Sequence, residues 1–225
     1  MEKTNNLWQN FQAKYELTEE QLNQFKKYAQ LLQEWNQKIN LTAMDSEEDI
    51  INYHFDDSLA VTKFVDFSNI HAVSDVGTGA GFPGIPVKIK YPELKVVLIE
   101  VTQKKINFLN LVIEELGLEN IEVYPLNWLT FLRKTEYNID LFFARASLHT
   151  DELLKVFARD SSYIPRQGSQ PSHKAMAGAA GQGRVQLIYW ASIKWEAMQE
   201  DTRYLKKIEK YKVGEKERQL IFFAK

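Results

Sequence analysis

The chain has 225 residues, of which 44% are hydrophobic and 26% are charged, and its formal net charge is -2. A chain of this length and composition can bury a full core as one large domain, and its charge favours no general attraction to nucleic acid beyond local basic patches. The sequence contains no cysteine, which excludes disulfides, thiolate metal sites and a cysteine nucleophile. No apolar run approaches the roughly 20 residues of a membrane span, and the N-terminus lacks a signal-peptide pattern, so we expect a cytoplasmic protein with no membrane contact.

The first third of the chain is expected to be helical. Apolar residues predict a short helix around Leu7–Phe11, and Thr18-Glu-Glu-Gln21 matches a capping box that opens a long amphipathic helix over Glu19–Gln37. A polar break then leads to another helix over Ile50–Phe64. We therefore expect residues 1–66 to form a helical segment that packs on a second domain, 67–225.

From Ile70 onward, short apolar runs alternate with helical stretches, which is typical of an α/β fold with a parallel sheet. One such helix, Lys104–Leu116, has Gly117 as its C-terminal stop. The predicted strands of this part are Ile70–Val76, Lys95–Glu100, Ile121–Leu126 and Ile139–Ala146.

The C-terminal third begins with a predicted helix over Asp151–Arg159. Glycines and prolines without a period then predict a mobile loop over 165–186. The remaining elements are expected to be a strand at Leu187–Ala191, a short helix near Trp195, and a closing pair of strands at Lys207–Val213 and Arg218–Phe223.

The segment Asp75-Val-Gly-Thr-Gly-Ala-Gly-Phe-Pro-Gly84 runs from a predicted strand into a helix start. Closely spaced glycines there allow positive φ and a close approach to a nucleotide-like cofactor. The dinucleotide-binding fingerprint Gly-x-Gly-x-x-Gly is matched only by Gly79, Gly81 and Gly84, and this match contains Pro83. The alternative spacing, with an acid followed by alternate glycines, is matched by Asp75, Gly77, Gly79 and Gly81 and resembles the first motif of class I S-adenosylmethionine-dependent methyltransferases.

Glu100 ends the second predicted strand, one β-α-β unit after this loop. Its carboxylate can accept hydrogen bonds from ribose hydroxyls. Both cofactor classes use an acid here, so Glu100 indicates a bound nucleoside, and a dinucleotide-dependent oxidoreductase stays open beside a methyltransferase.

Several longer motifs occur together: Asn36-Gln-Lys-Ile-Asn-Leu-Thr42, His54-Phe-Asp-Asp-Ser-Leu59, Gly81-Phe-Pro-Gly-Ile-Pro86, Lys104-Lys-Ile-Asn-Phe-Leu109 and Ala144-Arg-Ala146. With them the chain resembles, over about 20–150, the bacterial small-subunit ribosomal RNA guanine-N7 methyltransferases, also called glucose-inhibited division protein B. The resemblance implies a class I, Rossmann-like methyltransferase sheet with an N-terminal helical extension, and S-adenosylmethionine as cofactor. It also implies methylation of a guanine N7 in the 530 loop of 16S ribosomal RNA, either as RNA or in the small ribosomal subunit, and we expect a monomer.

Carried over to this chain, the family's cofactor contacts fall on strand ends at one edge of the sheet, where open α/β sheets bind ligands. The chain departs from the family pattern at Tyr53, where an arginine is usual, and at Leu129, where an acid is usual. A methyltransferase of another substrate and a noncatalytic ribosome-associated binding module therefore stay open. The glycine motif contributes its acid and its alternate glycines to the expected cofactor-binding residues, and the family resemblance contributes the others. The full set is Asp75, Gly77, Gly79, Gly81, Phe82, Glu100, Trp128, Leu129 and Arg145.

Guanine N7 carries an in-plane lone pair, so the implied reaction requires no general base, and we expect no metal. Rate would come from alignment of the reacting atoms, with Arg145, His54 and Asp57 as positioning candidates. We expect His54 and Asp57 to form hydrogen bonds at the interface between the helical segment and the sheet, and Asp140, at the start of its strand, to be structural. The candidates for binding RNA are Asn36, Asn40, Thr42, Lys104, Lys105 and Arg218.

Overall fold

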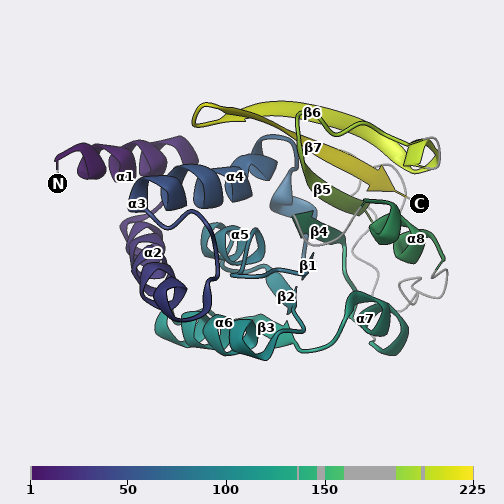
Figure 1. Cartoon of the computed structure of the whole chain (residues 1–225), viewed down its shortest axis with the longest axis horizontal. Helices are drawn as coiled ribbons and strands as arrows, with labels where there is room; N and C mark the ends of the chain where they lie inside the picture. Colours follow the sequence, from purple (N-terminus) through teal and green to yellow (C-terminus); the bar gives the residue numbers. More distant parts are fainter. Residues whose placement is uncertain (1, 136, 146–149, 160–185, 199–200, 225) are drawn as a thin grey trace.

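The computed structural model describes residues 2–135, 137–145, 150–159, 186–198 and 201–224. In this part of the chain a seven-stranded sheet has the order β3-β2-β1-β4-β5-β7-β6 (Figure 1). The first five strands in this order are parallel, whereas β7 runs antiparallel to both of its neighbours. The strands are β1 (Ala72–Val76), β2 (Lys95–Ile99), β3 (Ile121–Tyr124), β4 (Leu141–Arg145), β5 (Gln186–Ser192), β6 (Leu205–Val213) and β7 (Lys216–Ala224).

The register brings the carboxyl ends of the three central strands to one edge of the sheet. Asp75 of β1 lies opposite Leu98 of β2 and Phe143 of β4, and each strand ends within two residues of this level. The predicted parallel sheet is therefore confirmed, with boundaries shifted by one or two residues. At the opposite edge Oδ2 of Asp140 accepts hydrogen bonds from the backbone N–H groups of His71 (2.8 Å) and Ala72 (3.0 Å), which is the structural role expected for it.

The N-terminal third is helical, as predicted. It contains α1 (Glu2–Tyr15), α2 (Glu19–Ile39), α3 (Glu47–Asp49), η1 (Ile50–Phe55), α4 (Asp56–Leu59) and η2 (Ala60–Lys63), followed by the short η3 (Phe67–Asn69). The capping box is confirmed, because Thr18 and Gln21 exchange side-chain and backbone hydrogen bonds at the start of α2. The prediction of one regular helix over 50–64 is wrong: η1 is a π-helix, and η2 is a 3₁₀-helix. Side-chain periodicity does not distinguish these, although short π segments often occur at functional sites.

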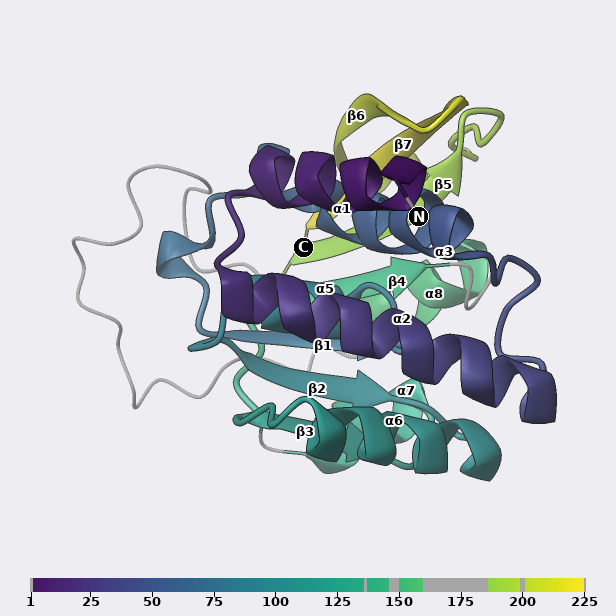
Figure 2. The same ribbon diagram turned by 90° about the vertical axis from the view of Figure 1, so that its left-hand side faces the viewer.

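Helices cover both faces of the sheet. On one face lie α1, α2, α5 (Gly84–Lys90) and α6 (Gln103–Glu115), and Figure 2 shows α2 running along this side. On the other face lie α7 (Trp128–Lys134) and α8 (Thr150–Arg159). A hydrophobic core lies on each face of the sheet: the first is covered by α1, α2, α5 and α6, and the second by α7 and α8. Alternate residues of β2 contribute to the two cores, with Val96 and Leu98 in the first and Val97 and Ile99 in the second. The division into segments 1–66 and 67–225 stays a prediction, since the first core continues without a break from Trp8 to Phe222.

The C-terminal part differs from expectation at one point. Trp195 is not helical, because the chain turns after β5 and the indole Nε1 donates a hydrogen bond to Oγ1 of Thr150 (2.8 Å). The β6–β7 hairpin is confirmed, with Gly214 and Glu215 in its turn. The loop predicted over 165–186 lies outside the described residues except for Gln186, which begins β5. Among the described helices, none is long and apolar enough to cross a membrane.

Candidate functional site

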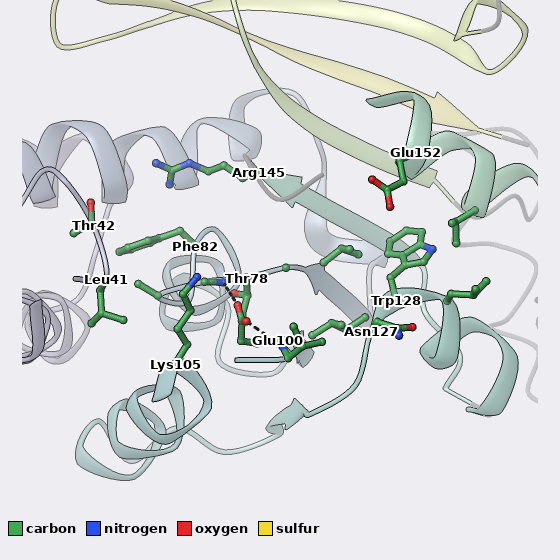
Figure 3. A pocket seen from close by; sticks show the side chains of 18 of the residues that line it. Leu41, Thr42, Thr78, Phe82, Glu100, Lys105, Asn127, Trp128, Arg145 and Glu152 are labelled. Atoms are coloured by element: carbon green, nitrogen blue, oxygen red, sulfur yellow. Dashed lines mark hydrogen bonds between the residues drawn. The ribbon is translucent and has the colours of Figure 1, made fainter. Parts of the chain in front are cut away.

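A cavity of about 680 Å³ opens at the carboxyl ends of β1, β2 and β4. Its volume falls within the range of about 300–1,000 Å³ that small-molecule sites usually have. Val76, Ile99 and Arg145 mark the strand ends in its wall, and the helical segment contributes Leu41, Thr42 and His54 (Figure 3). The cavity therefore lies where open α/β sheets bind ligands.

The glycine loop after β1 forms one wall of this cavity. Gly77, Gly79 and Gly81 have φ values of 64°, 63° and 101°, which favour glycine. A Cβ atom on Gly79 would meet no atom within 4 Å, so the loop leaves open space on its cavity side. A Cβ atom on Gly81 would lie 2.5 Å from Cδ1 of Ile85 and 2.6 Å from the hydroxyl of Tyr28. Gly81 therefore allows close packing against α5 and α2. It was expected to bind the cofactor, but it is not among the residues that line the cavity.

Asp75 also lies behind the loop rather than on the cavity wall. It is fully buried, and its Oδ2 accepts hydrogen bonds from Oγ1 of Thr78 (2.6 Å) and from the backbone N–H of Gly84 (2.8 Å). Burial raises the pKa of this carboxyl to about 6, against the opposing effect of those two hydrogen bonds. Asp75 was expected to contact the cofactor, but its carboxylate points toward the start of α5 and shapes the loop from behind, and it does not line the cavity.

Glu100 follows β2 and joins the glycine loop to the next helix. Its Oε1 accepts from the backbone N–H groups of Val101 (3.0 Å) and Thr102 (2.9 Å), and its Oε2 accepts from Gly79 (3.1 Å). Since each carboxylate oxygen can accept two hydrogen bonds, Oε2 retains one acceptor position at the cavity wall. A hydroxyl group fits that position.

Three rings form a stack beside the loop. The imidazole of His54 lies on the ring of Phe82, with 4.7 Å between centroids and 10° between planes. Phe82 also stacks with Tyr28, with 5.5 Å between centroids and 26° between planes, and the Tyr28 hydroxyl donates to the carbonyl of Ala80 at 2.5 Å. The helical segment therefore fixes both the backbone and the aromatic side chain of the loop.

Arg145, at the end of β4, points its guanidinium toward the helical segment (Figure 3). Its guanidinium makes four hydrogen bonds through Nη1 and Nη2 and one ion pair, all with that segment. Nε forms an ion pair with Oδ2 of Asp57 (3.1 Å), and Nη2 donates to the Tyr53 carbonyl (2.8 Å) and to Nδ1 of His54 (3.2 Å). Nη1 donates to Oγ of Ser58 (3.2 Å) and to the carbonyl of His54 (3.5 Å). Arg145 thus directs both Nη groups to the helical segment, while its charge lines the cavity wall with Cζ 5.5 Å from the centre of the Phe82 ring.

His54 is held as one neutral tautomer. Arg145 can only donate, so Nδ1 must accept; the carbonyl of Met44 can only accept, so Nε2 must carry the proton that it shares with Met44 (3.1 Å) and Thr42 (2.9 Å). Burial, together with the positive charge of Arg145, lowers the pKa of His54 to about 4. His54 and Asp57 form hydrogen bonds at the interface between the helices and the sheet, as predicted, with Arg145 between them.

The six candidates for RNA contact lie in different surroundings. Thr42 and Lys105 line the cavity, whereas Lys104 is exposed outside it. Asn36 is buried and supports the next turn: its Oδ1 accepts from the N–H of Thr42 (2.8 Å) and its Nδ2 donates to Asp45 (3.1 Å). Asn40 is the left-handed C-cap of α2, and Arg218 of β7 contacts Asp57 (3.4 Å). Contact of any of these residues with RNA stays a prediction.

Sequence reasoning missed part of the cavity wall. Glu152 points into it from α8, beside Trp128 (Figure 3), and Asn127 lines it while capping α7 through Thr130. The signal for Asn127 was its place as an N-cap residue immediately after a strand. Nothing local marked Glu152, because its position depends on how α8 docks on the sheet. Trp128 and Leu129 line the cavity as expected.

The strand order, the glycine loop after β1 and the acid after β2 define a class I S-adenosylmethionine-dependent methyltransferase fold. A structure of M. capricolum TrmK in complex with S-adenosylhomocysteine superposes with a TM-score of 0.51 and 17% sequence identity, covering 75% of this chain and 67% of that one. At this level of identity the likeness concerns the fold alone.

The family follows from sequence comparison. A family model described as rRNA small subunit methyltransferase G matches residues 21–162, and the chain belongs to this family. Ribosomal RNA small subunit methyltransferase G of Macrococcus caseolyticus is 40% identical over 162 residues, covering 69% of this chain and 68% of the relative. The enzyme of the same name from Exiguobacterium sibiricum is 49% identical over 106 residues, which is 47% of this chain and 44% of the relative. The match to that relative thus spans about half of its length.

Proposed function

We propose that this protein transfers a methyl group from S-adenosylmethionine to N7 of a guanine in the 530 loop of 16S ribosomal RNA, in the cytoplasm, with the RNA or the small ribosomal subunit as substrate. The observation that carries the proposal is the free acceptor position of Glu100 beside the open glycine loop, in a chain of the rRNA small subunit methyltransferase G family. The family supports the substrate, and the cavity supports the cofactor.

The residues of the cavity fit an amino-acid-bearing nucleoside. The carboxylate of Glu100 would accept a hydrogen bond from a ribose hydroxyl, while Ile99, Val101 and Trp128 supply apolar surface for a base. When the fingerprint is counted from Gly77, directly after β1, Phe82 stands at the third glycine position, which disfavours a pyrophosphate there. Lys105 adds a positive charge at the cavity wall that would suit a carboxylate.

When bound, the cofactor supplies an electrophilic methyl group on a sulfonium. Because guanine N7 already has a lone pair, the protein needs to remove no proton, and His54, with both ring nitrogens engaged, is poorly suited to do so. What the chain contributes is position: Tyr28, Phe82 and Arg145 hold one wall, and the pairing of Arg145 with Asp57 limits the positive charge near the reacting atoms.

The test is methyl transfer to small ribosomal subunits that lack the mark, with wild-type protein, Gly77→Asp and Arg145→Ala. Gly77 has a φ of 64° and lines the cavity, so an aspartate there adds strain and a negative charge near Glu100. We expect both variants to lose activity by at least about 100-fold, the scale of removing several kcal/mol of positioning. Full activity in Gly77→Asp would remove the proposed cofactor site.

Three alternatives would each give a different result in methyl-transfer and binding measurements. Methylation of free nucleotides or peptides as readily as of subunits would indicate a different substrate, and tight NAD binding without S-adenosylmethionine binding would indicate an oxidoreductase. A noncatalytic binding module is favoured by Leu129, which lines the cavity without any hydrogen-bonding group where the family usually has an acid. Subunit binding by wild-type protein without methyl transfer would establish that function.

A further inference from the structure

The carboxylate of Asp57 connects the cavity to the C-terminal hairpin. Its side chain is only 3% exposed, and its Oδ2 pairs with Nε of Arg145 (3.1 Å) from the sheet and with Nη2 of Arg218 (3.4 Å) from β7. Its Oδ1 accepts a hydrogen bond from the hydroxyl of Tyr211 on β6 at 2.6 Å. Two of the three side chains that hold this carboxylate therefore belong to the hairpin.

The turn of the hairpin makes a second contact with the surroundings of Arg145. A Cβ atom on Gly214 would lie 3.0 Å from the hydroxyl oxygen of Tyr53, and Nζ of Lys216 lies 4.1 Å from the centre of the Tyr53 ring. The carbonyl of Tyr53 accepts the shortest hydrogen bond of Arg145, at 2.8 Å. The hairpin thus packs against two of the groups that anchor the guanidinium, Asp57 and Tyr53.

Charge and geometry explain why this support matters. Two guanidiniums share one buried carboxylate, so a rotation of Asp57 would leave a partly buried cation without its counterion, which is costly. The Tyr211 hydroxyl opposes such a rotation because it fixes Oδ1 and thereby directs Oδ2 toward Arg145. A hydrogen bond to an ionised group is among the stronger ones in proteins.

We propose that the β6–β7 hairpin is a positioning element of the site, in which Tyr211 and Arg218 orient Asp57 so that it holds the Arg145 guanidinium against His54 and over Phe82. For its effect on rate, this inference rests on the proposed methyl transfer. Tyr211 and Arg218 act through Asp57 and do not line the cavity. The hairpin, which is distant in sequence from the glycine loop, would thereby control the geometry of one cavity wall.

The main variant is Tyr211→Phe, which removes one hydroxyl and keeps the ring and the net charge. Arg218→Met removes the second contact, and Arg218→Lys is the conservative variant that keeps the charge. The matched controls are Tyr204→Phe, just before β6, and Lys210→Met, on an exposed position of the same strand. Thermal unfolding establishes that each variant is folded.

With small subunits as substrate, we expect Tyr211→Phe and Arg218→Met to lower kcat by about tenfold, the effect of roughly one lost interaction in the transition state, while KM changes by less than about twofold. Arg218→Lys should recover most of the kcat, and both controls should match wild type. Unchanged kcat in folded Tyr211→Phe and Arg218→Met would overturn the inference.

A second measurement does not depend on activity. Besides burial, the charge of Arg145 lowers the pKa of His54, whereas the hydrogen bond to Met44 and the carboxylates of Asp57 and Asp49 raise it. Because Arg145 contacts Nδ1 of His54 directly (3.2 Å) and its effect on this pKa is larger than that of Asp57, we expect a displaced Arg145 to raise the pKa of His54. Titration of His54 by NMR should show the increase in Tyr211→Phe and none in Tyr204→Phe. An increase in a protein without methyl transfer would support the hairpin's role and refute the proposed function, whereas an unchanged His54 in Tyr211→Phe would refute the hairpin's role alone.

Discussion

Nη2 of Arg145 lies 3.2 Å from Nδ1 of His54, although the two residues are 91 positions apart in the chain. This contact joins the last residue of β4 to the π-helix of the N-terminal segment. It requires the imidazole to be neutral, because a second proton on Nδ1 would face a permanent cation. The stack of His54 on Phe82 then carries that requirement to the glycine loop.

The neutral state of His54 makes protein stability depend on pH. Its pKa is about 4 in the folded protein and 6.5 ordinarily, so the unfolded chain binds the proton more readily. The stabilisation that this depressed pKa implies is present above pH 6.5 and is lost as the pH falls toward 4. Between pH 7 and pH 5 we expect the free energy of unfolding of wild type, relative to His54→Gln, to fall by about 2 kcal/mol. Urea unfolding at both pH values measures this difference, and equal changes in the two proteins would contradict it.

Asp75 should show the opposite dependence. Its pKa is raised to about 6 by burial, so its contribution to stability is present below the ordinary value of 3.8 and is lost as the pH rises through 6. Asp75→Asn removes this titration and keeps an oxygen that can accept from Thr78 and Gly84. We expect the stability of Asp75→Asn relative to wild type to rise by about 1–2 kcal/mol between pH 5 and pH 8. Since the two groups offset each other, the pH profile of wild type alone is uninformative, and a flat difference curve for Asp75→Asn would be the contrary result.

Gly79 and Gly117 form a matched pair. Their φ values are 63° and 59°, and a Cβ atom on either would meet no atom within 4 Å, but only Gly79 lines the cavity. Alanine at either position should lower the free energy of unfolding by about 1–2 kcal/mol, because both residues have left-handed backbone conformations. Calorimetry with S-adenosylhomocysteine should show weaker binding for Gly79→Ala only. Equal affinity in the two variants would place the cofactor elsewhere.

Lys105 lines the cavity, and within the described residues its amino group has no hydrogen-bond or ion-pair partner. If Lys105 binds the carboxylate of the cofactor's amino-acid part, Lys105→Met should weaken the binding of S-adenosylhomocysteine by about tenfold or more. This is the usual effect of losing a hydrogen bond to a charged group. Binding of 5′-methylthioadenosine, which lacks that carboxylate, should change little. Lys104→Met, on the exposed neighbouring residue, is the control. An unchanged affinity for both compounds with a raised KM for subunits would instead indicate a phosphate contact.

The elements that could be predicted depend on local patterns. The capping box at Thr18 and Gln21, the alternation in β2 and the turn at Gly117 are each encoded within a few neighbouring residues. The spacing of the glycines identified the cavity loop, since positive φ is a property of single residues. The π-helix at 50–55 could not be predicted, because its apolar spacing does not differ clearly from that of an α-helix. Its carbonyls at Tyr53 and His54 accept hydrogen bonds from Arg145 of β4, a contact that no local pattern encodes.

For the site, the sequence by itself predicted that the glycine loop and Glu100 would lie together at the cavity, and it indicated the family, because these depend on residue types at short, regular spacings. Only the tertiary structure decided that Asp75 and Gly81 pack away from the cavity and that Glu152 faces it. It also decided that Arg145 donates its hydrogen bonds to the helical segment. The hairpin's hold on Asp57 belongs to the same group, with Tyr211 154 positions from its acceptor. Such contacts arise from how helices and strands dock, which no local pattern encodes.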